Sequence, residues 1–176
     1  MAKYVKSEVI CSEALFMIGN TFQTQDRWGS ALEQYKKVIN DYPMTTRGLE
    51  TPIYIAQYYK VKFQPEKMLS AFGEAIEHYR ALANKYPDSP TALKAYTLIS
   101  SCYRATKDWP NTINTLNTLM EKFKGKVNFD LILLDMALIY KKELKDPVKV
   151  KETVERMIKE YPDSKFLTAA KTLLKS

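Results

Sequence analysis

A tyrosine-proline pair that returns along the chain constrains its fold more than any other feature. The pair stands at Tyr42-Pro43, Tyr86-Pro87 and Tyr161-Pro162, and a degenerate copy at Phe123-Lys124 precedes the last of these. The successive aromatic residues are 44, 37 and 38 positions apart. A period in this range is typical of a two-helix unit stacked into a solenoid. The chain is therefore predicted to be all-α.

The composition of the 176-residue chain agrees with long helices joined at prolines. Glycine is scarce, with 5 residues, and several of the 8 prolines fall between segments of helical apolar periodicity. Hydrophobic residues make up 45% and charged residues 27%, as in a folded protein rather than a disordered chain. No apolar run is long enough to span a membrane. The segment MAKYVKSEVICSEALFM lacks an apolar core before a cleavage site, so no signal peptide is predicted in this chain.

The first unit, residues 4–43, shows the pattern of two closely packed helices. Apolar or small residues share one face of its first helix, at steps of three and four: Leu15, Ile18, Gly19 and Phe22. One face of its second helix carries Ala31, Tyr35 and Val38, and Pro43 then stops this helix. Gly19 and Ala31 are small enough to let the helices approach closely. Phe22 and Tyr35 fill the space beside them.

This order of small, aromatic and proline residues resembles the tetratricopeptide repeat. The resemblance continues in three further units, at residues 46–87, 90–124 and 127–162, and a terminal helix at 163–176 is expected to cap the stack. It implies a single domain over residues 1–176, built as a right-handed α-solenoid of four helix hairpins plus the capping helix. In the second unit, about seven extra residues around KFQPEKMLSAF either separate the two helices or lengthen the second.

Capping residues agree with these boundaries. Ser89-Pro90 and Asp146-Pro147 each read as an N-cap followed by proline at the first helical position. Asp108 is expected to cap the helix that contains Pro110, and Ser164 to cap the terminal helix. The terminal helix is predicted to carry an apolar stripe made of Phe166, Leu167, Ala170, Leu173 and Leu174.

Nothing in the chain motivates an enzyme activity or a cofactor. The only histidine, His78, has no metal-binding neighbour in sequence and is predicted to lie at the surface. Cys11 and Cys102 lack metal-binding spacing and fall in apolar-periodic segments, where a free cysteine behaves as a small buried hydrophobe. Asp130 and Asp135 are five residues apart and do not share a helix face. No phosphate-binding loop, nucleophile elbow or zincin motif is present.

The net charge of +7 and the isoelectric point near 9.2 raise the alternative of a nucleic-acid partner. The 27 basic residues, however, are spread along the chain and interleaved with 20 acidic ones, which favours a solvated surface. Tyrosine could stack on bases, but five tyrosines occupy packing positions of the repeat: Tyr35, Tyr59, Tyr79, Tyr103 and Tyr140. Nucleic-acid binding is therefore the weaker alternative.

In the tetratricopeptide family, the first helix of each hairpin lines a concave groove that binds partner segments. Carried over by alignment, the predicted groove takes three residues from each hairpin: Phe16, Asn20 and Gln23; Ile53, Gln57 and Lys60; Thr97, Ser101 and Arg104; Leu134, Leu138 and Lys141. Its apolar members are expected to form patches that a partner or the capping helix covers.

Three basic residues, Lys60, Arg104 and Lys141, occupy the same place in successive units and are predicted to form a row along the groove. The row is either ordinary solubilising charge or a receptor for an acidic or C-terminal carboxylate segment. The carboxylate clamp of some cytosolic relatives needs a lysine and an asparagine one helical turn apart in the first unit. This chain has Phe16 and Asn20 there, so it departs from that pattern.

The resulting hypothesis is a non-enzymatic scaffold for protein-protein interaction that binds a partner peptide or domain on its concave face. A structural module that self-associates or supports a larger envelope complex is the alternative. The Tyr-Pro-Asp-Ser joints resemble those of bacterial cell-envelope repeats, such as outer-membrane assembly lipoproteins and the Tol–Pal coordinator. This resemblance implies a periplasmic location, with the cytoplasm as the alternative.

Overall fold

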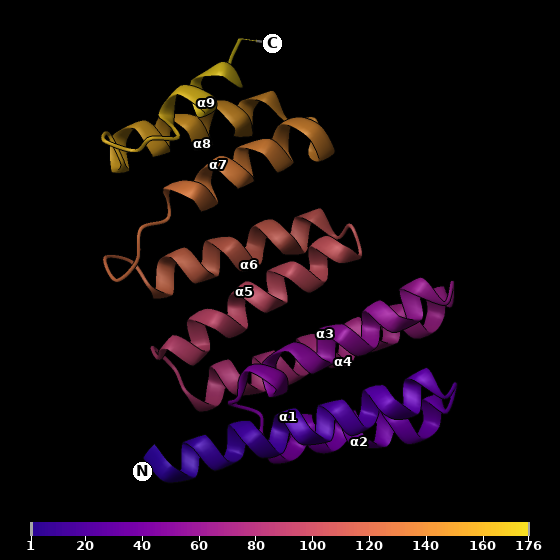
Figure 1. The fold of residues 1–176 in the computed structure, drawn as a ribbon. Coiled ribbons are helices and arrows are strands. Elements are labelled where there is room, and N and C mark those ends of the chain that lie inside the picture. Colours follow the sequence, from indigo (N-terminus) through magenta and orange to yellow (C-terminus); the bar gives the residue numbers. More distant parts are fainter. Residues whose placement is uncertain (1, 176) are drawn as a thin grey trace. The chain divides into compact units, whose positions relative to one another are not determined.

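The computed structural model describes the backbone of residues 2–175 and the side chains of residues 6–175. Every regular element in this range is helical: α1 (Ala2–Thr24), α2 (Trp28–Asp41), α3 (Thr46–Val61), α4 (Pro65–Lys85), α5 (Pro90–Ala105), α6 (Trp109–Lys122), α7 (Asp130–Ile139), the π-helical turn η1 (Tyr140–Leu144), α8 (Pro147–Glu160) and α9 (Leu167–Thr172) (Figure 1). The all-α prediction is therefore confirmed. None of these helices has the length and apolar character needed to cross a membrane.

The chain divides into two compact units, Met1–Pro87 and Asp88–Ser176. In the first unit α1 packs against α2, α3 packs against α4, and α3 also contacts both helices of the first pair. In the second unit α5 packs against α6 and α7 against α8, while α9 contacts α7 and α8. The helices thus pair as the predicted hairpins, in agreement with a helical solenoid of tetratricopeptide type. The single superhelical domain over residues 1–176 stays a prediction.

Close packing in the first hairpin follows the predicted pattern of small and aromatic residues. Ala31 and Tyr35 of α2 are fully buried. A Cβ atom added at Gly19 would lie 2.8 Å from Cδ1 of Tyr35, so the glycine leaves room for this ring. The interpretation of Gly19 as the residue that allows the two helices to approach is confirmed.

The buried face of α1 is rotated from the predicted one. Ile18, expected on that face, is 45% exposed, whereas Ser12, Phe16 and Gly19 are buried. These three residues follow steps of four and three, which place them on one side of the helix. The interior face of α1 therefore includes the ring of Phe16 and leaves out Ile18.

The predicted joints mark helix ends. The residue that follows each second helix is the expected aromatic: Tyr42, Tyr86, Phe123 and Tyr161 after α2, α4, α6 and α8. Ser89, Asp108 and Asp146 each accept a hydrogen bond from a backbone N–H in the first turn of the following helix, at 3.1, 3.2 and 2.9 Å. These three predicted N-caps are confirmed.

The extra residues of the second hairpin lengthen its second helix. Helix α4 has 21 residues, whereas α2, α6 and α8 have 14 each. Pro65 starts α4 at its first helical position, where its missing N–H leaves no hydrogen bond unmade. Of the two alternatives that the sequence leaves open, the structure has the longer helix.

The terminal helix is shorter than predicted. Helix α9 covers only Leu167–Thr172, and Leu174, expected in its buried stripe, is 45% exposed. The hydroxyl of Ser164 donates to Asp130 Oδ2 at 2.6 Å and accepts from the backbone N–H of Phe166 at 3.1 Å. Ser164 therefore shapes a turn before the helix, and its prediction as the helix N-cap is wrong.

The turns inside the four hairpins share one backbone geometry. A residue with positive φ stands directly before the N-cap position of each second helix: Asp26, Phe63, Lys107 and Lys145, with φ between 53 and 59°. In the first three turns the next backbone N–H donates to a carbonyl five residues earlier, as in a Schellman motif. In the last turn Asp146 donates to Tyr140, six residues earlier, because η1 absorbs one additional residue.

Candidate functional site

The first helices of the two hairpins in the first unit, α1 and α3, form a polar face. We call it the α1/α3 face and define it by Glu13, Asn20, Gln23, Arg47 and Tyr54. The side-chain hydrogen bonds between the two helices on this face join residues 31 or 34 positions apart, close to one repeat. Asn20 and Gln23 were predicted groove residues, and the structure brings them together.

Two side-chain amides and two tyrosine hydroxyls make a hydrogen-bond network on this face. Tyr35 Oη lies 2.7 Å from Asn20 Oδ1 and 3.1 Å from Gln23 Oε1. Tyr54 Oη lies 3.3 Å and 3.1 Å from the same two oxygens. Burial, followed by the hydrogen bond with Tyr54, raises the pKa of the Tyr35 phenol well above its ordinary value. Tyr35 therefore stays protonated. Each hydroxyl has one proton to donate, and the shortest contacts run from Tyr35 Oη to Asn20 Oδ1 and from Tyr54 Oη to Gln23 Oε1.

The donation by the tyrosines fixes how the two amides are oriented. Because their oxygens accept from tyrosine, the NH₂ groups of Asn20 and Gln23 remain as donors. Within residues 6–175, the buried side-chain nitrogen and oxygen atoms without a hydrogen-bond partner are Gln64 Oε1 and His78 Nε2. Neither NH₂ group belongs to this set, and both residues are only half-buried. The face thus presents two oriented hydrogen-bond donors.

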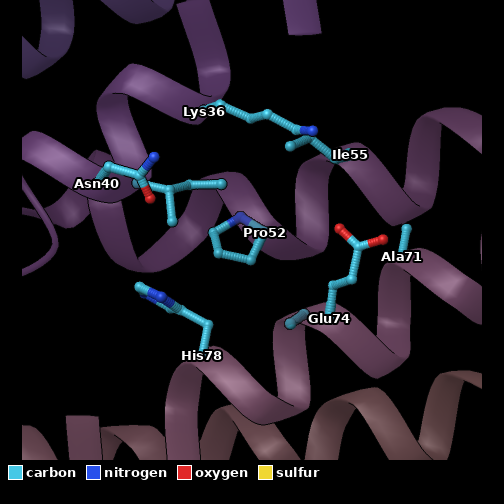
Figure 2. A pocket seen from close by; sticks show the side chains of 9 residues that line it. Lys36, Asn40, Pro52, Ile55, Ala71, Glu74 and His78 are labelled. Atoms are coloured by element: carbon cyan, nitrogen blue, oxygen red, sulfur yellow. The ribbon is translucent and has the colours of Figure 1, made fainter. Parts of the chain in front are cut away.

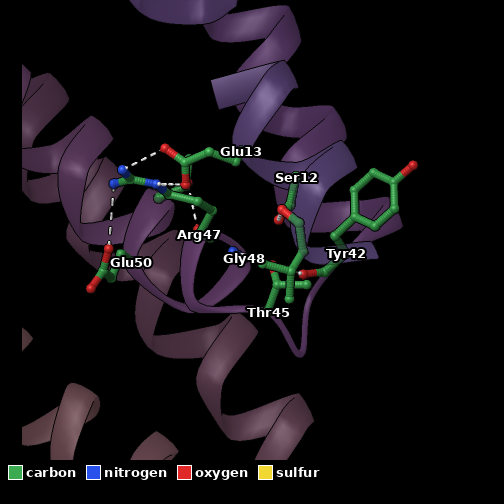
Figure 3. A network of polar contacts seen from close by, with 9 residues as sticks. Ser12, Glu13, Tyr42, Thr45, Arg47, Gly48 and Glu50 are labelled. Carbon is green, nitrogen blue, oxygen red and sulfur yellow. Dashed lines mark hydrogen bonds and ion pairs between the residues drawn. The ribbon is translucent and has the colours of Figure 1, made fainter. Parts of the chain in front are cut away.

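Arg47 joins α3 to α1 next to this network. Its guanidinium donates two hydrogen bonds of 2.8 Å to the carboxylate of Glu13 and lies 3.6 Å from Glu50 (Figure 3). The hydrogen bonds from Arg47 lower the pKa of Glu13. The guanidinium carbon also lies 4.2 Å from the centroid of the Phe16 ring. Phe16, predicted as an apolar groove anchor, is only 5% exposed and packs with Tyr35 and Tyr54 instead.

The position of Arg47 depends on the joint between α2 and α3. Thr45 is the N-cap of α3, and its hydroxyl oxygen accepts from the backbone N–H of Gly48 at 3.0 Å. Figure 3 shows Gly48 close to the backbone of Tyr42, where a Cβ atom would lie 2.8 Å from the Tyr42 carbonyl carbon. The close approach at Gly48 thus starts α3 directly beside the end of α2.

In the second unit, the polar groove residues predicted on α5 and η1 donate hydrogen bonds to other groups of the same unit. Arg104 makes two hydrogen bonds with the carboxylate of Asp135, one of them at 3.0 Å. The hydroxyls of Thr97 and Ser101 donate to carbonyls of their own helix, at 2.9 and 3.0 Å. Lys141 Nζ donates to the backbone carbonyl of Leu173 at 3.0 Å. Two members of the predicted basic row are therefore engaged within the unit.

The remaining predicted groove residues differ in exposure. Gln57 and Lys60 are exposed, and Ile53, Leu134 and Leu138 are half-buried. A row of charges that runs through both units stays a prediction. Sequence reasoning missed Glu13, Arg47, Tyr54 and Asp135. The signal that could have found them is complementary chemistry at a separation of 31 or 34 residues, one repeat along the chain.

A cavity of about 240 Å³ lies between α2 and α4, with Pro52 and Ile55 of α3 in its lining. Figure 2 shows Lys36 and Asn40 reaching toward it from α2, and Glu74 and His78 from α4. The prediction that His78 is a surface residue is wrong, because the side chain is half-buried and its Nε2 is a buried atom without a partner. The longer helix α4 carries the histidine along the cavity wall.

Acid is expected to destabilise the first unit through His78. Burial lowers its pKa below the ordinary value of 6.5, so the unfolded chain binds a proton more readily than the folded one. Stability is fully present above 6.5 and falls as the pH drops from there through the lower folded-state pKa. Lys36 and Glu74 are the charged groups that line the same cavity. Melting curves at about pH 7.5 and pH 5.5 should differ for the native chain and differ less for His78→Asn. An equal shift in both proteins would contradict the assignment.

The cysteines of the two units differ. Cys102 is fully buried in α5, and burial raises the pKa of its thiol to about 12. Cys11 of α1 is exposed, so the expectation of burial is confirmed for Cys102 and wrong for Cys11. Both are free thiols. No group of three or more metal-ligating side chains occurs in the part of the chain that the structure describes.

Comparison with protein families identifies the first hairpin. Residues 13–43 match the family model described as tetratricopeptide repeat. The matched segment contains Gly19, Ala31 and Tyr35, whose packing in the structure follows the small-and-aromatic pattern of that repeat. No curated protein matches the chain in sequence. The cell-envelope location stays a prediction. Residues 13–43 therefore carry a tetratricopeptide repeat, and the helix pairs that follow are consistent with a helical solenoid of the same type.

Proposed function

We propose that the α1/α3 face binds an extended peptide segment of a protein partner. A tetratricopeptide repeat is in general a module for protein-protein interaction, and the matched repeat supplies α1, with both amides. The observation that carries the proposal is the orientation of Asn20 and Gln23 by the two tyrosine hydroxyls. Oriented NH₂ groups suit the backbone carbonyls that an extended segment presents along its length.

The charges on the α1/α3 face do not require its partner to be acidic. Arg47 is paired with Glu13 and lies near Glu50, so its charge is balanced within the face. Gln57, which is exposed on α3, adds a further amide near the end of the helix. The recognition we propose therefore rests on hydrogen bonds to the peptide backbone, with affinity added by half-buried rings such as Tyr54 and Tyr58.

Isosteric variants test this function without disturbing the fold. Asn20→Asp and Gln23→Glu, made singly, keep the oxygen that accepts from tyrosine but replace the NH₂ donor by a carboxylate oxygen. Peptides selected on the native chain from a random peptide library should bind each variant roughly tenfold more weakly or worse, since a lost donor becomes a repulsive acceptor. Affinities are measured by calorimetry.

The matched control is Asn114→Asp, the same chemical change at an exposed position of α6. It should leave the affinity for the selected peptides unchanged. Selected peptides that bind both α1 variants as tightly as the native chain would show that the α1/α3 face is not the peptide site.

A further inference from the structure

The turn between α3 and α4 carries an aromatic residue that the fold does not need. Phe63 is 92% exposed and has a φ of 53°, a conformation that bulky side chains rarely adopt. The same position holds Asp26, Lys107 and Lys145 in the other three hairpins, so the turn accepts polar residues. A strained, exposed aromatic side chain that contributes nothing to the core points to an interaction.

Apolar and basic side chains alternate around Phe63. Val61 is 73% exposed, and Lys60, Lys62 and Lys67 are all exposed. We call these four residues and Phe63 the α3–α4 tip. Lys62 Nζ lies 4.0 Å from Asp26 Oδ1, but that aspartate is 92% exposed, so solvent screens the pair. The tip therefore presents two apolar side chains among three lysines, with a single exposed carboxylate, that of Glu66, in the same turn.

An aromatic base supports the tip. The Trp28 ring stacks on Tyr58 with centroids 3.4 Å apart and an interplanar angle of 6°. Trp28 Nε1 donates to Tyr59 Oη at 3.0 Å. Lys62 and Lys67 lie 5.7 and 5.8 Å from the ring centroids of Tyr58 and Tyr59. Half-buried tryptophan and tyrosine beside exposed lysine is the composition that favours the boundary between bilayer and water.

We propose that the α3–α4 tip binds the surface of an anionic phospholipid bilayer. Phe63 and Val61 enter the interface, and Lys60, Lys62 and Lys67 contact the headgroup phosphates. A bilayer accepts a projecting aromatic ring without a matching pocket, whereas a protein partner would need a pocket fitted to it. The net charge of +7 adds a general attraction to an anionic surface. The proposal goes beyond peptide binding at the α1/α3 face and does not depend on it.

Sedimentation of the full chain with lipid vesicles tests the proposal. The native protein should bind vesicles that contain phosphatidylglycerol, bind phosphatidylcholine vesicles much less, and dissociate as salt is added. Phe63→Asn should lower the affinity for anionic vesicles by about tenfold or more, because the main apolar anchor is lost. The same variant should melt at a higher temperature than the native chain, because asparagine tolerates positive φ better than phenylalanine.

Charge and apolar controls complete the experiment. Replacing Lys60, Lys62 and Lys67 together by glutamine should weaken binding far more than the same change at three exposed lysines of the second unit, Lys94, Lys122 and Lys159. Val148→Ser, at an apolar residue that is 64% exposed elsewhere, should leave binding unchanged. The proposal is overturned if the native chain does not sediment with anionic vesicles, as expected for a tip that binds only a protein. Equal binding by Phe63→Asn, or equal losses in both lysine triples, would overturn it as well.

Discussion

Gly48→Ala is expected to lower the free energy of unfolding of the first unit by about 3 kcal/mol. A Cβ atom at this position would lie 2.8 Å from the carbonyl carbon of Tyr42 and 2.9 Å from that of Pro43, and closer still to the Tyr42 oxygen. These are backbone atoms, so no side-chain rotation relieves the contact. Urea unfolding followed by Trp28 fluorescence, with Trp109 of the second unit replaced by phenylalanine, measures the loss in the first unit alone.

The chain offers a matched control for this change. Gly73→Ala makes the same substitution within α4, at an exposed glycine where a Cβ atom would meet nothing within 4 Å. It should stabilise the first unit by about 1 kcal/mol, since alanine favours a helix interior over glycine. The two variants are thus expected to differ in sign. If Gly48→Ala unfolds like the native chain, α3 does not start against the end of α2 as described.

Tyr35→Ala is expected to lower the free energy of unfolding of the first unit by about 4 kcal/mol. The side chain is fully buried, and its ring centroid lies 5.3 Å from those of Phe16 and Tyr54 and 5.9 Å from that of Trp28. Removing the ring leaves a cavity between α1, α2 and α3 and withdraws one of the donors to Asn20 and Gln23. The same urea titration, with circular dichroism as a second probe, measures the effect.

Tyr35→Phe separates the ring from its hydroxyl. It retains the packing and should cost only about 1 kcal/mol, the net value of a typical hydrogen bond. The Tyr54 hydroxyl still donates to one of the two amides in this variant. A loss as large as that of Tyr35→Ala would mean that the network, rather than the ring, stabilises the first hairpin pair.

The sequence predicted helix ends and N-caps well, because these features depend on residues that are adjacent along the chain. Proline and aromatic residues at the joints fixed where the second helices end, and Ser89, Asp108 and Asp146 cap helices as expected. These choices depend on the backbone of one turn and so can be read from a few letters. The short helix α9 shows the limit of this method, since the Ser164 hydroxyl bonds to Asp130, 34 residues earlier.

The candidate site was predicted only in part, for a physical reason. The repeat pattern correctly predicted that Asn20 and Gln23 lie on the face that α1 turns toward α3. It did not predict the tyrosine that orients them from α3. A rotation of a helix by one position moves a side chain by about 100° around its axis, and α1 turned Phe16 inward where Ile18 was expected. The cavity beside His78 depends on spacing between helices, which residue letters do not specify.

The packing of helices only against near neighbours in the chain has a consequence for biosynthesis. In each unit, helices that pack together are adjacent in the chain or separated by one α-helix. Their contacts therefore join residues that are close in sequence. The first unit has all of its packed helices by residue 87. It is therefore expected to fold while the ribosome is still adding the second unit, in order from the N-terminus. Each first helix would then expose its apolar face only until the second helix of its hairpin has been synthesised.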